Sequence, residues 1–136
     1  MTAHARVLIA FAVAGLVVAP RTGRAGDSED ADRALFIKYC AACHGEDGKG
    51  GGVARPALVD APPDLTRLAR DAGGDFPLGR VIRAIDGRDH IRAHGSADMP
   101  VWGEVFAADP LNDRLEVRMK VRRLAEHVRR IQEPGG

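Results

Sequence analysis

The pentapeptide Cys40-Ala41-Ala42-Cys43-His44 constrains this chain more than any other feature. It holds the only two cysteines among 136 residues, and its C-x-x-C-H spacing is typical of c-type haem attachment. Residues three apart at a helix end lie on one side, so both thiols can reach one porphyrin. The adjacent histidine can then turn its imidazole to the iron. The sequence therefore predicts one covalent haem c held through Cys40 and Cys43, with His44 as an iron ligand.

Two other roles compete for these cysteines. A redox-active disulfide of the C-x-x-C type is expected in a thioredoxin-like βαβ context, and the sequence has no strand-like alternation of useful length. A structural zinc site needs four protein ligands, usually including a second pair of Cys or His residues, and there is no third cysteine. A haem-free thiol protein stays open as an alternative.

A haem iron held by one histidine needs a second axial ligand. A methionine thioether stabilises ferrous iron and raises the reduction potential. Met99 lies in a predicted loop stiffened by Pro100, although a methionine can also simply fill core space. Met119 lies in a charged helical segment and is expected at the surface. Met99 is the predicted ligand, and His90 and His94 are the alternatives, which would give bis-histidine ligation.

The N-terminus has the features of a secretory signal. Arg6 precedes an unbroken apolar run over residues 7–19, which is too short to span a bilayer as a helix. Gly23 and Ala25 supply the small residues of a cleavage site after Ala25. We therefore expect residues 1–25 to be a cleaved signal peptide and the protein to be periplasmic.

Cleavage would leave residues 26–136 as one haem-binding domain without a membrane span. It would remove Arg6, Arg21 and Arg24 and no acidic residue, which lowers the formal net charge from +1 to −2. Such a charge gives no electrostatic case for binding nucleic acid. In the alternative, Arg21 and Arg24 act as a stop signal and the uncleaved segment anchors the protein in the membrane, facing the periplasm.

The predicted fold is all-α, with about three to five helices and long loops wrapped around the haem. Aromatic residues are only 4% of the chain, so a cofactor is expected to fill much of the core. Residues 45–52 contain five glycines and predict a loop, and residues 88–111 are expected to be irregular. Capping residues and apolar periodicity predict helices over 28–42, 65–70, 77–86 and 112–132.

Further motifs stand in a fixed order around the pentapeptide. Phe36 lies four residues before Cys40, and Pro56 lies twelve residues after His44. They are followed by Pro62-Pro63-Asp64-Leu65-Thr66, Met99-Pro100-Val101-Trp102-Gly103 and Leu124-Ala125-Glu126-His127-Val128.

Together with the pentapeptide, these motifs make residues 30–133 resemble a class I cytochrome c of the small bacterial periplasmic type. The resemblance implies that the first and last helices cross, with Phe36 packed against Leu124 and Val128. It also implies that the Pro56 carbonyl accepts the Nδ1–H of His44, which would fix the ring and strengthen it as a ligand. By the same resemblance, the haem wall would comprise Leu65, Phe76, Ile82, Ile85 and Trp102.

Two positions depart from the family pattern. Many members have glycine at the position of Asp32, where the helices touch, so we expect either a looser crossing or an ion pair with Arg129 or Arg130. The last helix often carries an aromatic residue at the position of His127, which is expected here to be a polar edge residue.

The segment 112–132 is rich in basic residues. A solvated face is the default interpretation, and a docking patch for an acidic redox partner is the functional one. The basic residues are Arg114, Arg118, Lys120, Arg122, Arg123, Arg129 and Arg130, accompanied by Glu116 and Glu126.

The predicted function is one-electron transfer, because two axial ligands leave no vacant iron position for a substrate. The protein would be a carrier and not an enzyme, either as a soluble periplasmic shuttle or as the cytochrome subunit of a periplasmic dehydrogenase. Its partners would be a donor dehydrogenase or a terminal oxidase or reductase of a respiratory chain. The alternative is a peroxidase-like enzyme or a gas-binding sensor with a labile sixth ligand.

Overall fold

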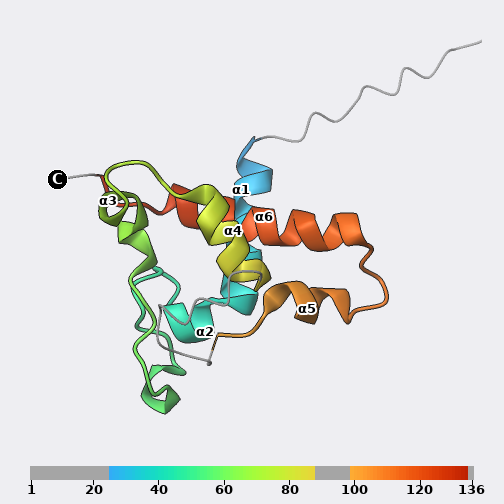
Figure 1. The fold of residues 1–136 in the computed structure, drawn as a ribbon, viewed down its shortest axis with the longest axis horizontal. Helices are drawn as coiled ribbons and strands as arrows, with labels where there is room; N and C mark the ends of the chain where they lie inside the picture. Colours follow the sequence, from blue (N-terminus) through green and yellow to red (C-terminus); the bar gives the residue numbers. More distant parts are fainter. Residues whose placement is uncertain (1–24, 88–98, 135–136) are drawn as a thin grey trace, which may run out of the picture.

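The computed structural model describes residues 25–87 and 99–134, and these residues form helices joined by long loops, with no strand among them (Figure 1). The predicted all-α class is confirmed. The described part contains six α-helices, more than the three to five expected. They are α1 (Ala25–Tyr39), α2 (Ala41–His44), α3 (Leu68–Asp71), α4 (Leu78–Asp86), α5 (Trp102–Ala107) and α6 (Arg114–Arg130), with 3₁₀ turns η1 (Arg55–Ala57) and η2 (Leu65–Arg67).

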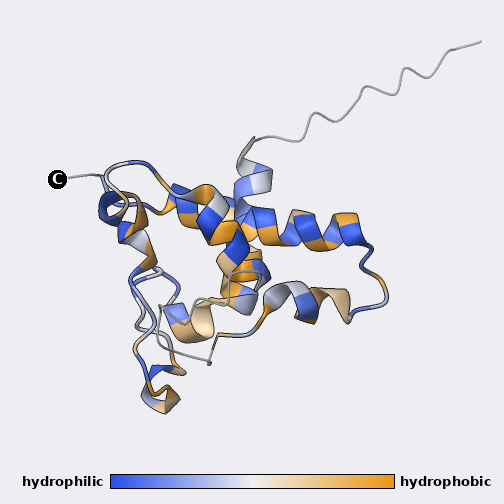
Figure 2. Cartoon of the chain, viewed as in Figure 1, coloured by the Kyte–Doolittle hydropathy of each residue, from blue (hydrophilic) through white to orange (hydrophobic). Residues whose placement is uncertain are grey.

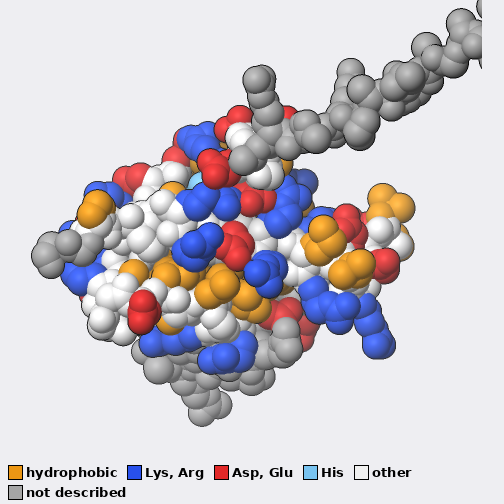
Figure 3. All heavy atoms as spheres, turned by 90° about the horizontal axis from the view of Figure 1, so that it is seen from above, with side chains coloured by type: hydrophobic (Ala, Val, Ile, Leu, Met, Phe, Trp, Pro, Cys, Tyr) orange, Lys and Arg blue, Asp and Glu red, His pale blue; other side chains and the backbone are white. Residues whose placement is uncertain are grey.

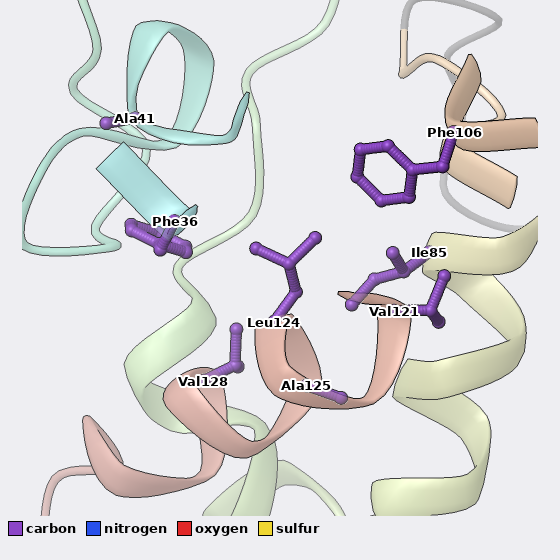
Figure 4. Packing of buried hydrophobic residues seen from close by; sticks show 8 residues of the cluster. All are labelled: Phe36, Ala41, Ile85, Phe106, Val121, Leu124, Ala125 and Val128. Carbon is purple, nitrogen blue, oxygen red and sulfur yellow. The ribbon is translucent and has the colours of Figure 1, made fainter. Parts of the chain in front are cut away.

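The core forms where α1 crosses α6 (Figure 1). Phe36 of α1 and Leu124 of α6 are 0% exposed, and both lie in one buried cluster with Val128, as the resemblance implied (Figure 4). Helices α4 and α5 add Ile85 and Phe106 to the same cluster. Burying an aromatic side chain and its aliphatic neighbours contributes about 1.5–3 kcal/mol for each, so this crossing is the main apolar contact of the fold.

Charged residues border the same crossing. Asp32 is buried, and its two carboxylate oxygens accept hydrogen bonds from Arg123 Nε and Arg130 Nη2, each at 2.5 Å. The predicted pair with Arg130 is confirmed. Arg129 instead binds Glu126 at 2.7 Å within α6. The aspartate therefore joins α1 to α6 through two arginines that lie on the same face of α6, about two turns apart.

The prediction for His127 was wrong, because this residue is 6% exposed and not at a polar edge. Its imidazole packs on the ring of Phe36, with centroids 4.8 Å apart. Its Nε2 atom is buried and makes no hydrogen bond among the described residues. The imidazole of His127, although polar, therefore packs in the core as an aromatic side chain would.

Local capping explains where several helices begin and end. Asp113 accepts hydrogen bonds from the backbone N–H groups of Leu115 and Glu116 at 2.7 and 2.8 Å and so begins α6. Asp64 does the same for Thr66 at 2.9 Å and begins η2. Gly87 ends α4 in the left-handed conformation, as expected. Figure 2 shows that α6 is largely hydrophilic, with apolar residues on the face toward the core.

Two helix boundaries differ from the predictions. The first helix does not run on to residue 42, because the chain turns at Cys40 and starts the separate helix α2. Helix α5 forms where irregular chain was expected, although Pro100 and Gly103 flank its start. The packing of Phe106 into the buried cluster holds this helix in place, and the local pattern of apolar residues does not predict that contact. No helix in the described ranges is long and apolar enough to cross a membrane, and the predicted signal segment lies outside them except for Ala25.

Candidate functional site

The two cysteines and His44 lie within one turn of the chain at the end of α1. The backbone N–H of Cys40 donates to Phe36 O at 2.8 Å, so the first thiol is attached to the last turn of α1. The N–H groups of Cys43 and His44 donate to Cys40 O at 3.2 and 2.9 Å. Both cysteines are free thiols and half-buried. Cys40 at the N-cap of α2, and Cys43 and His44 within it, therefore place both thiols and the imidazole on one turn of the chain.

The glycine-rich loop folds back onto this turn. Gly50 N donates to His44 O at 2.7 Å, and Gly52 N donates to Cys43 O at 3.1 Å. Gly50 has φ +86°, which favours glycine, and a Cβ atom on Gly52 would overlap the carbonyl oxygens of Ala41 and Ala42. The loop thus holds the backbone of the pentapeptide at a distance that only glycine permits.

His44 is buried, and its protonation state suits a metal ligand. Burial lowers the pKa of the imidazole, and the backbone carbonyl of Pro63 opposes this shift only in part. The ring is therefore neutral at pH 7, as binding to iron requires. Its Nδ1 atom is buried and makes no hydrogen bond with the part of the chain that the structure describes.

The predicted hydrogen bond from His44 to Pro56 is not formed. Pro56 lies in the exposed turn η1, whereas the carbonyl that acts on the imidazole belongs to Pro63. The segment around Pro63 runs along the glycine loop, because Leu65 N donates to Gly48 O at 2.8 Å. The spacing from His44 pointed to Pro56, but spacing alone could not show which proline carbonyl lies close enough to affect the imidazole.

The thiol chemistry disfavours a redox-active pair. Burial, and to a lesser extent the neighbouring Cys43, raises the pKa of Cys40 to about 12. Redox-active C-x-x-C cysteines instead have a lowered pKa, because the thiolate is the nucleophile. Within residues 25–87 and 99–134 there is also no group of three or more His, Cys, Asp or Glu side chains placed to hold a metal ion.

The residues predicted for the haem wall surround the core cluster. Ile85 is buried, whereas Leu65, Phe76, Ile82 and Trp102 are half-buried and pack against the cluster. Their role as a wall stays a prediction.

Sequence reasoning missed two aromatic residues beside the site. Tyr39, which directly precedes Cys40, packs edge-on against Trp102 and Phe106, with centroids 5.3 and 5.0 Å apart. Trp102 and Phe106 stack at 5.7 Å. This aromatic trio joins the end of α1 to α5. The position of Tyr39 one residue before the pentapeptide was the only signal that could have pointed to it.

Met99 is 41% exposed, and the chain from Val101 packs near Gly87 at the end of α4. Met119 is 47% exposed on α6, so its predicted surface position is confirmed. His90 and His94, the alternative ligands, lie outside the described residues.

The donor set fits a covalently held haem. Two free thiols, one at the N-cap of α2 and one three residues later within it, can form thioether bonds, and a neutral buried imidazole follows directly. Apolar side chains that pack around the core provide surroundings of low polarity. The residues present therefore match the chemistry that the pentapeptide predicts.

Comparison with known proteins also indicates a protein that holds a covalent haem. The family model described as Cytochrome c matches residues 32–109, more than half of the chain. This range contains the pentapeptide, the glycine loop, Met99 and Trp102. No curated protein and no solved structure was found to match the chain.

Proposed function

Because the chain belongs to the cytochrome c family, we propose that it is an electron carrier whose haem iron is bound by His44 and Met99. Members of this family hold haem c covalently, and Cys40 and Cys43 have the spacing for the two thioether bonds. Bound haem supplies an iron that alternates between the ferric and ferrous states and so passes one electron at a time. The observation that carries the proposal is the buried, neutral imidazole of His44 directly after two free thiols.

Residues of this chain would both keep the haem attached and set its reduction potential. Two covalent links would keep the cofactor in an exported protein, and His44 would be oriented by the glycine loop that binds its carbonyl. A thioether from Met99 would favour the ferrous state and raise the potential. A complete ligand set would leave no position for substrate, which makes a carrier and not an enzyme.

A periplasmic location and a transient redox partner complete the proposal. The apolar run at 7–19 and the small residues Gly23 and Ala25 support export. The shuttle would contact its partners through a small surface, as transient redox complexes do.

Most basic side chains of α6 are bound to other side chains of this chain. Arg123 and Arg130 bind Asp32, Arg122 and Arg129 bind Glu126, and Lys120 donates to Asn112 at 2.6 Å. Figure 3 shows basic side chains interspersed with acidic ones on the face seen there. Among the described residues, Arg114, Arg118 and Lys120 are the basic residues of α6 that pair with no acidic side chain. Lys120 is held by Asn112 and by the ring of Phe106, so a docking role would fall to Arg114 and Arg118.

Ligation is tested by the ferric spectrum of Met99→Ala beside that of Met119→Ala. The two methionines are similarly exposed, at 41% and 47%, so they form a matched pair. Met99→Ala should abolish the weak far-red sulfur-to-iron band and lower the potential, whereas Met119→Ala should leave both unchanged. An unchanged band in Met99→Ala would refute His/Met ligation. Rapid binding of CO by the ferrous wild-type protein would favour an open iron site instead.

A further inference from the structure

The chain beyond α6 is hydrogen-bonded to the turn at 65–69, which follows the glycine loop in the sequence. Gln132 uses both ends of its amide: Oε1 accepts from Ala69 N at 2.8 Å, and Nε2 donates to Leu65 O and Val128 O, each at 2.7 Å. The backbone N–H of Glu133 donates to Thr66 O at 2.8 Å. We call Gln132 and Glu133 the C-terminal clasp. Figure 1 shows the end of the red helix beside α3.

The segment 65–69, which the clasp holds, is itself hydrogen-bonded to the glycine loop. Leu65, whose carbonyl binds Gln132, donates its own N–H to Gly48 O at 2.8 Å. Gly50 N, two residues further along, donates to His44 O at 2.7 Å. A continuous set of hydrogen bonds and short backbone steps therefore connects the amide of Gln132 with the backbone of the iron ligand.

Two more contacts, one from Glu133 of the clasp and one from the preceding Ile131, join this end of the chain directly to the glycine loop. Lys49 Nζ lies 2.6 Å from Glu133 Oε1, and the side chain of Ile131 fills the space into which a Cβ atom on Gly48 would project. The Lys49–Glu133 pair is half-exposed, at 50% and 44%, so it contributes little by itself. The half-buried amide of Gln132 is the stronger element, because its three partners are all backbone groups.

We propose that Gln132 is a positioning residue for His44: it holds the turn at 65–69, and through it the glycine loop that binds the His44 carbonyl and so orients the imidazole. The role rests on haem binding through His44 and does not depend on whether Met99 is also a ligand. A loosened loop would admit water beside the iron. Water stabilises the more highly charged ferric state, so the potential would fall.

The test substitutes Gln132→Glu in the haem-loaded protein. The change keeps the size and the oxygen that accepts from Ala69, but it places a carboxylate oxygen against the carbonyls of Leu65 and Val128. The matched control is Asn112→Asp, since Asn112 donates its amide to a backbone carbonyl, that of Phe106, at 2.8 Å on the α5 side of the fold. Gln132→Met, which removes the hydrogen bonds without adding charge, serves if Gln132→Glu does not fold.

Amide hydrogen exchange and the midpoint potential are the readouts. Gln132→Glu should speed exchange at the N–H groups of Leu65 and Gly50 by roughly tenfold or more and lower the potential. Asn112→Asp should change neither. If Gln132 only stabilised the fold, Gln132→Glu would lower stability but leave the midpoint potential unchanged, and this result would contradict the positioning role.

Equal exchange and equal potential in Gln132→Glu, Asn112→Asp and wild type would overturn the positioning role and leave the proposed function intact. Exported wild-type protein without covalent haem would overturn both.

Discussion

Asp32 and Arg123 stand 91 positions apart in the sequence, yet Arg123 Nε lies 2.5 Å from Asp32 Oδ1 and joins the first long helix to the last. The side chain of Asp32 is 10% exposed, and its other oxygen binds Arg130. A carboxylate with two arginines thus stands where many family members bring the helices together at a glycine.

Substitution Asp32→Asn should lower the free energy of unfolding by about 1–3 kcal/mol at pH 7, because two arginines lose their counter-charge in a half-buried setting. Glu126→Gln is the control, since Glu126 also binds two arginines, but both lie on its own helix. It should cost no more than about 0.5 kcal/mol. Denaturant titration of both variants measures the difference, and equal losses would contradict an inter-helix role.

The Asp32 contacts also predict how stability depends on pH. Burial raises the pKa of Asp32, but the hydrogen bonds and charges of Arg123 and Arg130 outweigh it and hold the pKa below 3.8. A lowered folded-state pKa stabilises the fold above the unfolded-state pKa, and this contribution is lost as the pH falls through the folded-state pKa. The stability gap between wild type and Asp32→Asn should therefore close toward pH 2. A difference in unfolding free energy that stays constant from pH 7 to pH 2 would contradict a lowered pKa of Asp32.

His127→Phe should stabilise the protein, with a larger gain at acid pH. Burial, followed by the charge of Arg130, lowers the pKa of His127, while Asp32 opposes and Arg33 reinforces the shift. A lowered histidine pKa means that the unfolded chain takes up the proton first, so stability falls as the pH drops below about 6.5.

Phenylalanine would remove that proton and the unsatisfied Nε2, for a gain of about 1–2 kcal/mol. Thermal unfolding at pH 8 and pH 5 should show the larger increase in Tm at pH 5. A gain independent of pH would show that packing, and not protonation, limits the wild type.

Gly52→Ala should destabilise the site by about 1–3 kcal/mol, because the added Cβ overlaps the carbonyl oxygens of Ala41 and Ala42. Its neighbour provides the control, since a Cβ on Gly51 would meet nothing within 4 Å. Gly51→Ala should change stability by no more than about 0.5 kcal/mol. Covalent haem yield and urea midpoints of the two variants test this, and similar values would mean that the loop shifts without cost.

Phe106→Ala should cost about 3–5 kcal/mol, because Phe106 is 2% exposed and joins Tyr39 and Trp102. Val105→Ala, one residue earlier and 46% exposed, should cost about 0.5 kcal/mol or less. Guanidinium denaturation followed by far-UV circular dichroism compares them. A small loss for Phe106→Ala would indicate that α5 contributes little to the core.

Much of the fold could be predicted because its signals are local. Asp113 caps α6 through N–H groups two and three residues away, and Gly87 ends α4 through its own backbone conformation. The pentapeptide likewise specifies its chemistry within five consecutive residues. Helix α5 was missed because it is short and depends on Phe106 reaching a distant cluster.

The amino-acid order alone predicts covalent attachment of a haem c at Cys40 and Cys43, with His44 beside them, and the approximate course of the main helices, since these depend on neighbouring residues. Only the folded chain decides that Asp32 meets Arg123, that His127 is buried against Phe36, and that the Pro63 carbonyl, not that of Pro56, acts on His44. Each of these relationships depends on how a helix is rotated or how a loop returns. Such arrangements arise from the packing of segments far apart in the sequence, and residue spacing carries no record of them.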